Sequence, residues 1–415
     1  MRVLRPRFLV LLIALLAPAI ALRGQAAAPE VRGLWVVRTS LATPASIARV
    51  VRDAKQSGFN TLLVQVRGRG DAYYASALEP RATALAKQPP SFDPLRAMID
   101  AAHAAGLQVH AWVSLNLVAS AHELPAAPEH LANRHPDWLM VPRALAQELS
   151  NADSASPAYL GKIARWTRTQ SAVEGIFASP IPSASAIHTA AVVADIAKRY
   201  EVDGVHLDYV RYPSPDFDYS RSALNEFRAS VVADLTPAER ERLDGRLRID
   251  ATAYVDMFPQ RWAAFRRSRL TSLVMRVRTA LRAARPAAVL SAAVHPDADA
   301  AFTTRLQDWR LWADNRLIDV SCPMAYTPDA AEFASQIADA SRFTPPGGLW
   351  TGIGAYRLSA AQVAANIEAA RRAGASGFVL FSYESLGDAS APAADYLGEV
   401  GRAAFADFLP GAAGR

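Results

Sequence analysis

Eight short runs of apolar and β-branched residues recur along the chain, and a stretch of helical character follows each of them. This alternation is typical of parallel strands joined by crossover helices, and eight such units favour a closed barrel over an open sheet. We therefore predict an α/β protein with a single (β/α)₈ TIM barrel. The expected strands are residues 32–38, 61–67, 107–114, 204–209, 289–295, 319–325, 349–355 and 377–383.

Local signals agree with this order of elements. Thr43-Pro44 is typical of a helix start, and Gly58 of a helix end just before a strand. Two connections, residues 116–203 and 210–288, are longer than a barrel requires. Both follow the third and fourth strands at the end where barrel enzymes build their sites, so we expect these long loops to wall a substrate groove.

The first residues predict export. Residues 1–21 have the pattern of a signal peptide, with three arginines before an apolar run at 8–20 that ends in small residues, and cleavage could also fall as late as residue 28. This run is too short to cross a bilayer, and no later segment is longer and uncharged. We expect a periplasmic or secreted bacterial protein without a membrane span, whose barrel domain covers residues 30–408.

Composition narrows the class of partner. The single cysteine, Cys322, excludes an internal disulfide, and its apolar strand predicts that it packs as a small hydrophobic residue. The formal charge of +6 falls to about +3 when three arginines leave with the leader, so we expect no nucleic-acid partner. The arginine-rich segment 261–285 is interpreted as the solvated face of a long helix. The sequence carries no signal for an oligomeric state.

The segment 202–213 is the most informative part of the chain. Because side chains alternate along a strand, His206 and Asp208 should point into the barrel, and the outward set should be Val205, Leu207 and Tyr209. A carboxylate near the carboxyl end of a barrel strand is costly unless it is paired or functional. Asp208 is therefore our candidate catalytic residue, and the alternative is a structural carboxylate held by Arg211 or by a nearby backbone amide.

The same alternation gathers further polar and aromatic groups at this end of the barrel. Aromatic faces bind the apolar faces of sugar rings, while amide, carboxylate and guanidinium groups bind hydroxyls. A polysaccharide or oligosaccharide substrate is therefore predicted, although each such residue alone is more often part of a core. The candidate substrate-binding residues are Gln65, Arg67, His110, Trp112, Asn116, His206, Arg211, His295, Asp297, Tyr326, Trp350, Tyr356 and Tyr383.

Glycosidic cleavage usually needs two carboxyl groups. Asp208 and Glu384 follow the fourth and eighth strands, which face each other across a barrel, and Asp297 is a second choice for the partner. A separation of about 5 to 5.5 Å suits retention of configuration, and about 6.5 to 9.5 Å suits inversion. We predict Asp208 and Glu384 as the catalytic pair.

The sequence gives less support to a metal site, a serine nucleophile or a phosphate-binding loop. His110, His206, His295 and Asp208 could converge on a metal, but no compact ligand motif such as His-Glu-x-x-His is present. No Gly-x-Ser-x-Gly elbow or phosphate-binding glycine loop occurs either. We expect no metal and no other cofactor. A non-catalytic carbohydrate-binding barrel and a metal-dependent deacetylase or isomerase remain alternatives.

Several sequence blocks resemble a known family, the bacterial glycosyl hydrolase-like 10 proteins, over nearly the whole mature chain. They include RGLWV at residues 32–36, DGVHLDYVRYP at 203–213, DVSCPMAY at 319–326 and GFVLFSY at 377–383. The resemblance implies a TIM barrel and glycoside hydrolysis, since the family includes exported enzymes acting on peptidoglycan glycan strands.

The resemblance also bears on the fourth strand. It places Asp208 at the family's acidic position there, but Leu207 stands where many relatives have a first of two adjacent aspartates. The predicted function is thus an exported glycoside hydrolase that cleaves O-glycosidic bonds of a bacterial polysaccharide such as peptidoglycan glycan.

Overall fold

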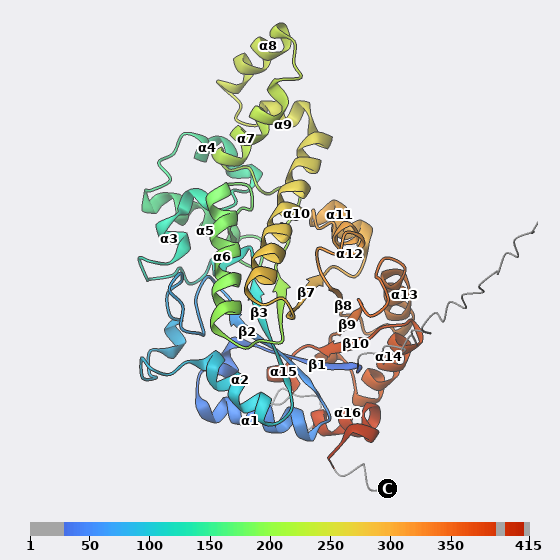
Figure 1. Cartoon of the computed structure of the whole chain (residues 1–415). Helices are drawn as coiled ribbons and strands as arrows, with labels where there is room; N and C mark the ends of the chain where they lie inside the picture. The colour runs from blue at the N-terminus through green and yellow to red at the C-terminus, as the bar shows by residue number, and fades with distance from the viewer. Residues whose placement is uncertain (1–28, 387–394, 411–415) are drawn as a thin grey trace, which may run out of the picture.

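The computed structural model describes residues 29–386 and 395–410, and the expected leader lies outside them. Eight parallel strands close into a barrel in the order β1-β10-β9-β8-β7-β6-β3-β2, which confirms the predicted TIM barrel (Figure 1). Each predicted run overlaps one strand, and β1 begins one residue earlier than predicted. The strands are β1 (Val31–Val36), β2 (Thr61–Arg67), β3 (Gln108–Ser114), β6 (Gly204–Asp208), β7 (Val289–Val294), β8 (Val320–Ala325), β9 (Trp350–Ile353) and β10 (Gly377–Leu380).

Helices cover the outside of the barrel (Figure 1). The first begins as predicted, because the side chain of Thr43 caps it and Gly58 follows its end with a φ of +81°. The covering helices are α1 (Pro44–Gln56), α2 (Pro94–Ala104), α6 (Ser183–Arg199), α10 (Pro259–Ala284), α11 (Ala298–Thr304), α12 (Trp309–Asp314), α13 (Ala330–Ser341), α14 (Ala360–Arg372) and α16 (Tyr396–Ala404).

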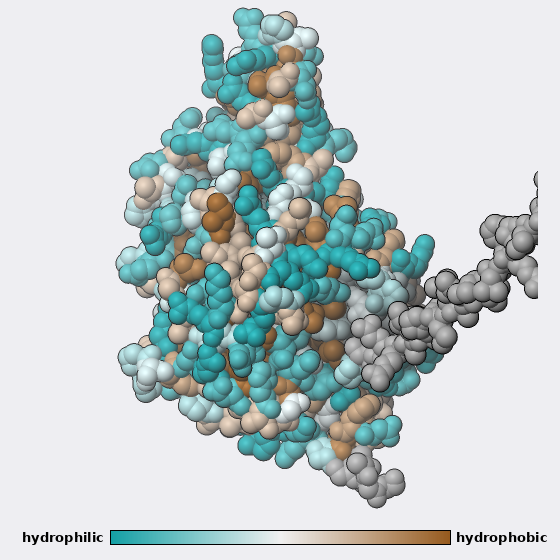
Figure 2. All heavy atoms as spheres, viewed as in Figure 1, coloured by the Kyte–Doolittle hydropathy of each residue, from teal (hydrophilic) through white to brown (hydrophobic). Residues whose placement is uncertain are grey.

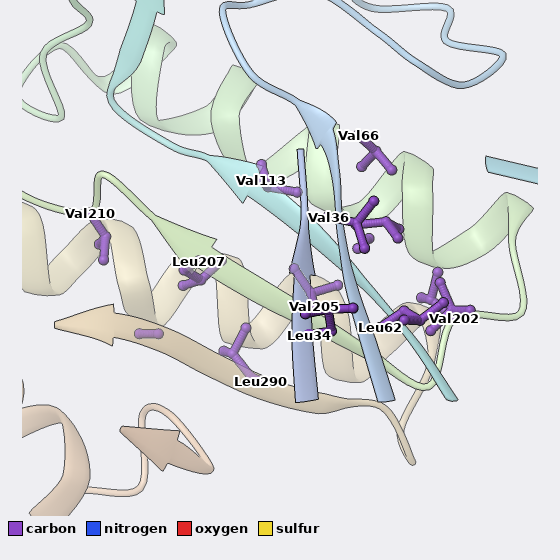
Figure 3. Close-up of a cluster of buried hydrophobic side chains, with 14 of the residues drawn as sticks. Leu34, Val36, Leu62, Val66, Val113, Val202, Val205, Leu207, Val210 and Leu290 are labelled. Atoms are coloured by element: carbon purple, nitrogen blue, oxygen red, sulfur yellow. The ribbon is translucent and has the colours of Figure 1, made fainter. Parts of the chain in front are cut away.

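Strand alternation separates two buried layers. Outward side chains such as Val205 and Leu207 pack against the helices, and Figure 3 shows this layer over β1, β2, β3, β6 and β7. Inward apolar side chains fill the barrel and include Trp35, Trp112 and Cys322. Cys322 is fully buried, as its apolar strand predicted.

Register sets the level of the inward residues. In the parallel pairing of β2 with β3 and of β3 with β6, Gln65 lies beside Trp112, and Trp112 beside His206. Ser114 lies beside Asp208, two residues further along the strands towards their carboxyl ends. Asp208 is therefore the last inward residue of β6.

Both long connections contain secondary structure. The first holds β4 (Leu117–Ala119), α3 (Leu131–Arg134), α4 (Ala146–Ser150), α5 (Pro157–Arg168) and β5 (Ile176–Phe177), and β4 pairs with β5 in antiparallel fashion. The second holds α7 (Arg221–Val232), α8 (Pro237–Leu247) and α9 (Ala253–Met257), which rise with the start of α10 beyond the barrel (Figure 1). The remaining short helices are α15 (Tyr383–Leu386) and 3₁₀ turns at Arg38–Leu41, Thr83–Leu85, Pro136–Trp138, Arg143–Leu145, Ala355–Arg357 and Ala406–Phe408.

The surface in Figure 2 is mainly hydrophilic, with apolar residues in small separate groups. No helix within residues 29–386 and 395–410 has an apolar stretch long enough to cross a membrane. The arginines of α10 are largely engaged in ion pairs. Arg282 lies 2.6 Å from Asp319, and Arg269 lies 3.0 Å from Glu226. This agrees with the interpretation of α10 as a solvated helix face.

Candidate active site

A pocket of about 300 Å³ opens at the carboxyl ends of the barrel strands. Its position matches the place where TIM-barrel enzymes carry out chemistry. The lining residues are Trp35, Val37, Arg38, Gln65, Gly68, Arg69, Trp112, Leu117, Asp208, Tyr209, Arg211, Ala293, Met324, Tyr326 and Phe381. A larger cavity of about 500 Å³ lies among α4, α7 and α9, but it has no acidic residue in its lining and lies away from the strand ends.

Asp208 is held in one orientation at this pocket. Its Oδ2 accepts a hydrogen bond from the indole of Trp112 at 3.1 Å, and its Oδ1 accepts from the amide of Tyr209 at 2.6 Å. Arg211 donates to the same Oδ1 at 3.3 Å. These contacts position a carboxylate that is only 7% exposed and still lines the pocket. The predicted inward direction of Asp208 is therefore confirmed.

Tyr209 departs from the predicted alternation. β6 ends at Asp208, and Tyr209 has a φ of +50°, a left-handed conformation that is uncommon for a residue with a side chain. Its ring therefore lines the pocket, whereas unbroken alternation placed it on the outer face. Backbone strain of this kind is often found at functional sites.

Arg211 links two carboxylates. Besides Asp208, its guanidinium lies 3.7 Å from Oε1 of Glu174, an exposed residue just before β5. The guanidinium also stacks 4.2 Å from the ring centre of Tyr209. Burial would lower the pKa of Arg211, but the negative charge of Asp208 offsets this and the pKa is raised. Arg211 thus stays charged and fixes the pocket edge.

His206 lies beneath the pocket and outside its lining. Its Nε2 accepts from the indole of Trp35 at 3.1 Å, and its Nδ1 is 2.9 Å from the hydroxyl of Ser291. Complete burial lowers the pKa of His206 to about 3. The ring is therefore neutral, and both nitrogens are used within the barrel.

This environment makes His206 a source of acid sensitivity. The folded pKa lies below the ordinary 6.5, so the stabilisation is complete above pH 6.5 and is lost as the pH falls towards 3. Between pH 7.5 and 4.5 we expect His206 to account for a loss of about 3 kcal/mol in unfolding free energy. Urea unfolding at both pH values should show a smaller loss in His206→Gln. Equal losses in the two proteins would contradict the prediction.

Aromatic side chains form the pocket wall. Trp112 and Tyr326, both predicted to bind substrate, line it, and Phe381 lies 5.5 Å from Tyr326 between ring centres. Tyr356 lies 6.2 Å from Phe381 and is 37% exposed, which places it beside the wall. Such surfaces suit the apolar faces of sugar rings.

Arg67 and Asn116 lie outside the lining. The guanidinium of Arg67 is fully buried, 2.6 Å from Glu79. The amide of Asn116 donates to the carbonyl of Ala178. Gln65 does line the pocket, where its Oε1 accepts from Arg38 at 2.8 Å.

The other predicted binding residues also lie outside the lining. His110 and Trp350 meet inside the barrel, with ring centres 5.4 Å apart. The hydroxyl of Tyr383 donates to Asp53 on α1. The side chain of Asp297 caps α11, and the backbone amide of Asp297 donates a hydrogen bond to Nδ1 of His295. The structure therefore brings together Gln65, Trp112, Asp208, Arg211 and Tyr326, with Tyr356 near them.

Glu384 occupies a different position from the one that strand geometry suggested. It lies in α15, and its Oε1 accepts from the amide of Val37 at 2.9 Å and from the hydroxyl of Ser40 at 2.6 Å. Its Oε2 is buried and has no hydrogen-bond partner among the residues that the structure describes. Burial raises the pKa of Glu384. The residue is absent from the lining, but its partner Val37 belongs to it.

Sequence reasoning missed several residues of the pocket. Arg38 follows β1 and Arg69 follows β2, so their places after strand ends were the available signal. Glu174 gave no signal, because it lies deep in a long connection. Among the described residues, no three histidine, cysteine, aspartate or glutamate side chains gather as a metal-binding group.

Comparisons with known proteins agree with this architecture. Residues 30–365 match the model of a family described as glycosyl hydrolase-like 10. The glycosyl hydrolase DigH of Escherichia coli (strain K12) is 25% identical over 341 residues, covering 73% of this chain and 67% of DigH. The glycosyl hydrolase YngK of Bacillus subtilis (strain 168) is 25% identical over 170 residues, covering 40% of this chain, and the chain spans only 28% of YngK's length.

A solved structure shares the fold. The PgaB (BpsB) glycoside hydrolase domain from Bordetella bronchiseptica aligns with a TM-score of 0.59 and 13% identity. The alignment covers 88% of this chain and 100% of that domain. At this identity the likeness concerns the fold alone.

Proposed function

The chain belongs to the glycosyl hydrolase-like 10 family, and from this premise we propose that it hydrolyses O-glycosidic bonds of a bacterial polysaccharide at the Asp208 pocket. The observation that carries the proposal is the oriented carboxylate of Asp208 in an aromatic pocket at the strand ends. A sugar ring would lie against Trp112 and Tyr326, with its scissile bond near Asp208.

The second carboxyl group has two candidates. Glu384 has a raised pKa from burial, and a protonated acid is what leaving-group protonation requires. Glu174 is exposed near the pocket, and Arg211 reaches both it and Asp208. We propose Glu384 as the general acid, because burial raises the pKa of its carboxyl group and so favours the protonated form.

The proposed substrate and location are supported by the family resemblance and by the first residues of the chain. Peptidoglycan glycan strands are the proposed substrate, since the family that the chain resembles includes enzymes acting on them. The leader-like residues 1–21 support export to the periplasm or beyond, where this polymer is found.

The proposal is tested by mass spectrometry of soluble products after incubating the mature protein with purified peptidoglycan and with peptide-stripped glycan strands. We expect new reducing ends from at least one of them. Glu384→Gln should lower their release about a hundredfold or more, and Glu174→Gln should lower it far less. The reverse order would assign the second role to Glu174, and no release from any glycan would contradict hydrolysis.

A non-catalytic carbohydrate-binding barrel is the second candidate, because Asp208 is the one acidic residue among those that line the pocket within the described ranges. It predicts that glycan strands are retained in a pull-down while no reducing ends appear. The product assay and the pull-down therefore separate the two functions.

A further inference from the structure

The pocket lining carries more positive than negative side chains. Among the described residues, three arginines line it and Asp208 is the one carboxylate. Arg211 and Asp208 form an ion pair at 3.3 Å, and Glu174 lies 3.7 Å from the other side of the same guanidinium. The charge of Arg211 is therefore balanced. The other two lining arginines are Arg38 and Arg69.

Neither remaining guanidinium has an acidic partner within 4.0 Å in the described part of the chain. Nη1 of Arg38 donates to the neutral amide of Gln65 at 2.8 Å. Nη1 of Arg69 donates to the backbone carbonyl of Glu174 at 3.2 Å. Each group keeps further N–H donors beyond these neutral acceptors. The pocket thus holds two guanidinium groups that form no ion pair within the described residues, although the charges of Asp71 and Glu174 act on Arg69 from farther away.

The two side chains are close enough to act together. Burial lowers the pKa of Arg69, and the positive charge of Arg38 acts in the same direction. Tyr209, Asp71 and Glu174 act in the opposite direction but do not cancel the lowering. Like charges in a partly buried pocket repel each other unless an anion lies between them. The side chain of Arg38 passes close over Gly68, where an added Cβ would lie 2.7 Å from its Cδ and Nη1.

We propose that Arg38 and Arg69 form an anion subsite beside Asp208, which binds a carboxylate carried by a sugar unit of the substrate. This inference rests on the proposed function and specifies which glycans the pocket prefers. Guanidinium groups match the planar geometry of a carboxylate with paired N–H donors, and such charge-assisted bonds are the strong ones. The aromatic wall would bind the sugar ring, and this subsite would determine which sugar unit lies beside Asp208.

The test measures binding without turnover, using the full mature protein with Asp208→Asn. The ligands are peptide-stripped glycan strands, whose muramic units carry free carboxylates, and the same strands after chemical reduction of those carboxylates to alcohols. We expect the acidic strands to bind on the order of tenfold more tightly than the reduced strands. Arg38→Gln and Arg69→Gln should each remove most of this preference and leave binding of the reduced strands unchanged.

Two further variants make the result specific. Arg276→Gln, which removes an exposed charge from α10, should keep the preference. Gly68→Ala keeps every charge but displaces Arg38, so it should weaken binding of the acidic strands alone. Equal affinity for acidic and reduced strands, or equal loss of both in the arginine variants, would overturn the subsite. If the unmodified protein cleaves both strands equally well, the subsite fails while the hydrolase function stands.

Discussion

Asp208→Asn is expected to lower glycan cleavage by at least about a hundredfold while leaving the fold and glycan binding intact. Asparagine has the same shape and keeps one acceptor oxygen, which can serve either the indole of Trp112 or the amide of Tyr209 but not both. It loses the negative charge that a nucleophile or base needs. The measurement is the rate of reducing-end release from the glycan that the unmodified protein cleaves, together with a pull-down of the same glycan.

The matched control is Asp297→Asn. Asp297 also follows a barrel strand and was the second choice for a catalytic carboxyl, but it lies outside the pocket lining and caps α11. Asparagine caps helices about as well as aspartate, so this variant should keep both stability and activity. Full activity in Asp208→Asn would remove Asp208 from the mechanism, and equal losses in both variants would indicate a general effect of charge.

The strand pattern was sufficient to predict the barrel and the inward direction of His206 and Asp208, because alternation is a local property of extended backbone. It failed at Tyr209, where the positive φ ends the strand and turns the ring into the pocket. The family match confirms the resemblance seen at residues 203–213 and the glycoside hydrolase class.

The alternation of side chains along a strand could not predict the hydrogen-bond or ion-pair partner of each polar side chain. It put Arg67 among the binding residues, but the partner Glu79 comes from a loop whose path no periodicity describes. It likewise placed Glu384 over the barrel centre, whereas the amide of Val37 and the hydroxyl of Ser40 hold it at the β1 end.

The largest effect on stability is expected from Glu79→Gln. Glu79 and Arg67 are both almost completely buried and meet through several hydrogen bonds, including Nη2 to Oε1 at 2.6 Å. Burial would raise the pKa of Glu79, but Arg67 lowers it to about 2, so the pair stays ionised at neutral pH. Removing the carboxylate leaves a buried guanidinium without a counter-ion, which costs about 3 to 5 kcal/mol.

Urea unfolding of Glu79→Gln at neutral pH measures this cost. Glu148→Gln is the control, because Glu148 pairs with Lys162 at the surface and should change the unfolding free energy by less than about 1 kcal/mol. Adding Arg67→Met to Glu79→Gln should recover part of the loss, since the unpaired charge is then gone. A loss below 1 kcal/mol in Glu79→Gln would mean that water or another group compensates Arg67. Arg67 would then be free to serve the substrate, as its place at the carboxyl end of β2 first suggested.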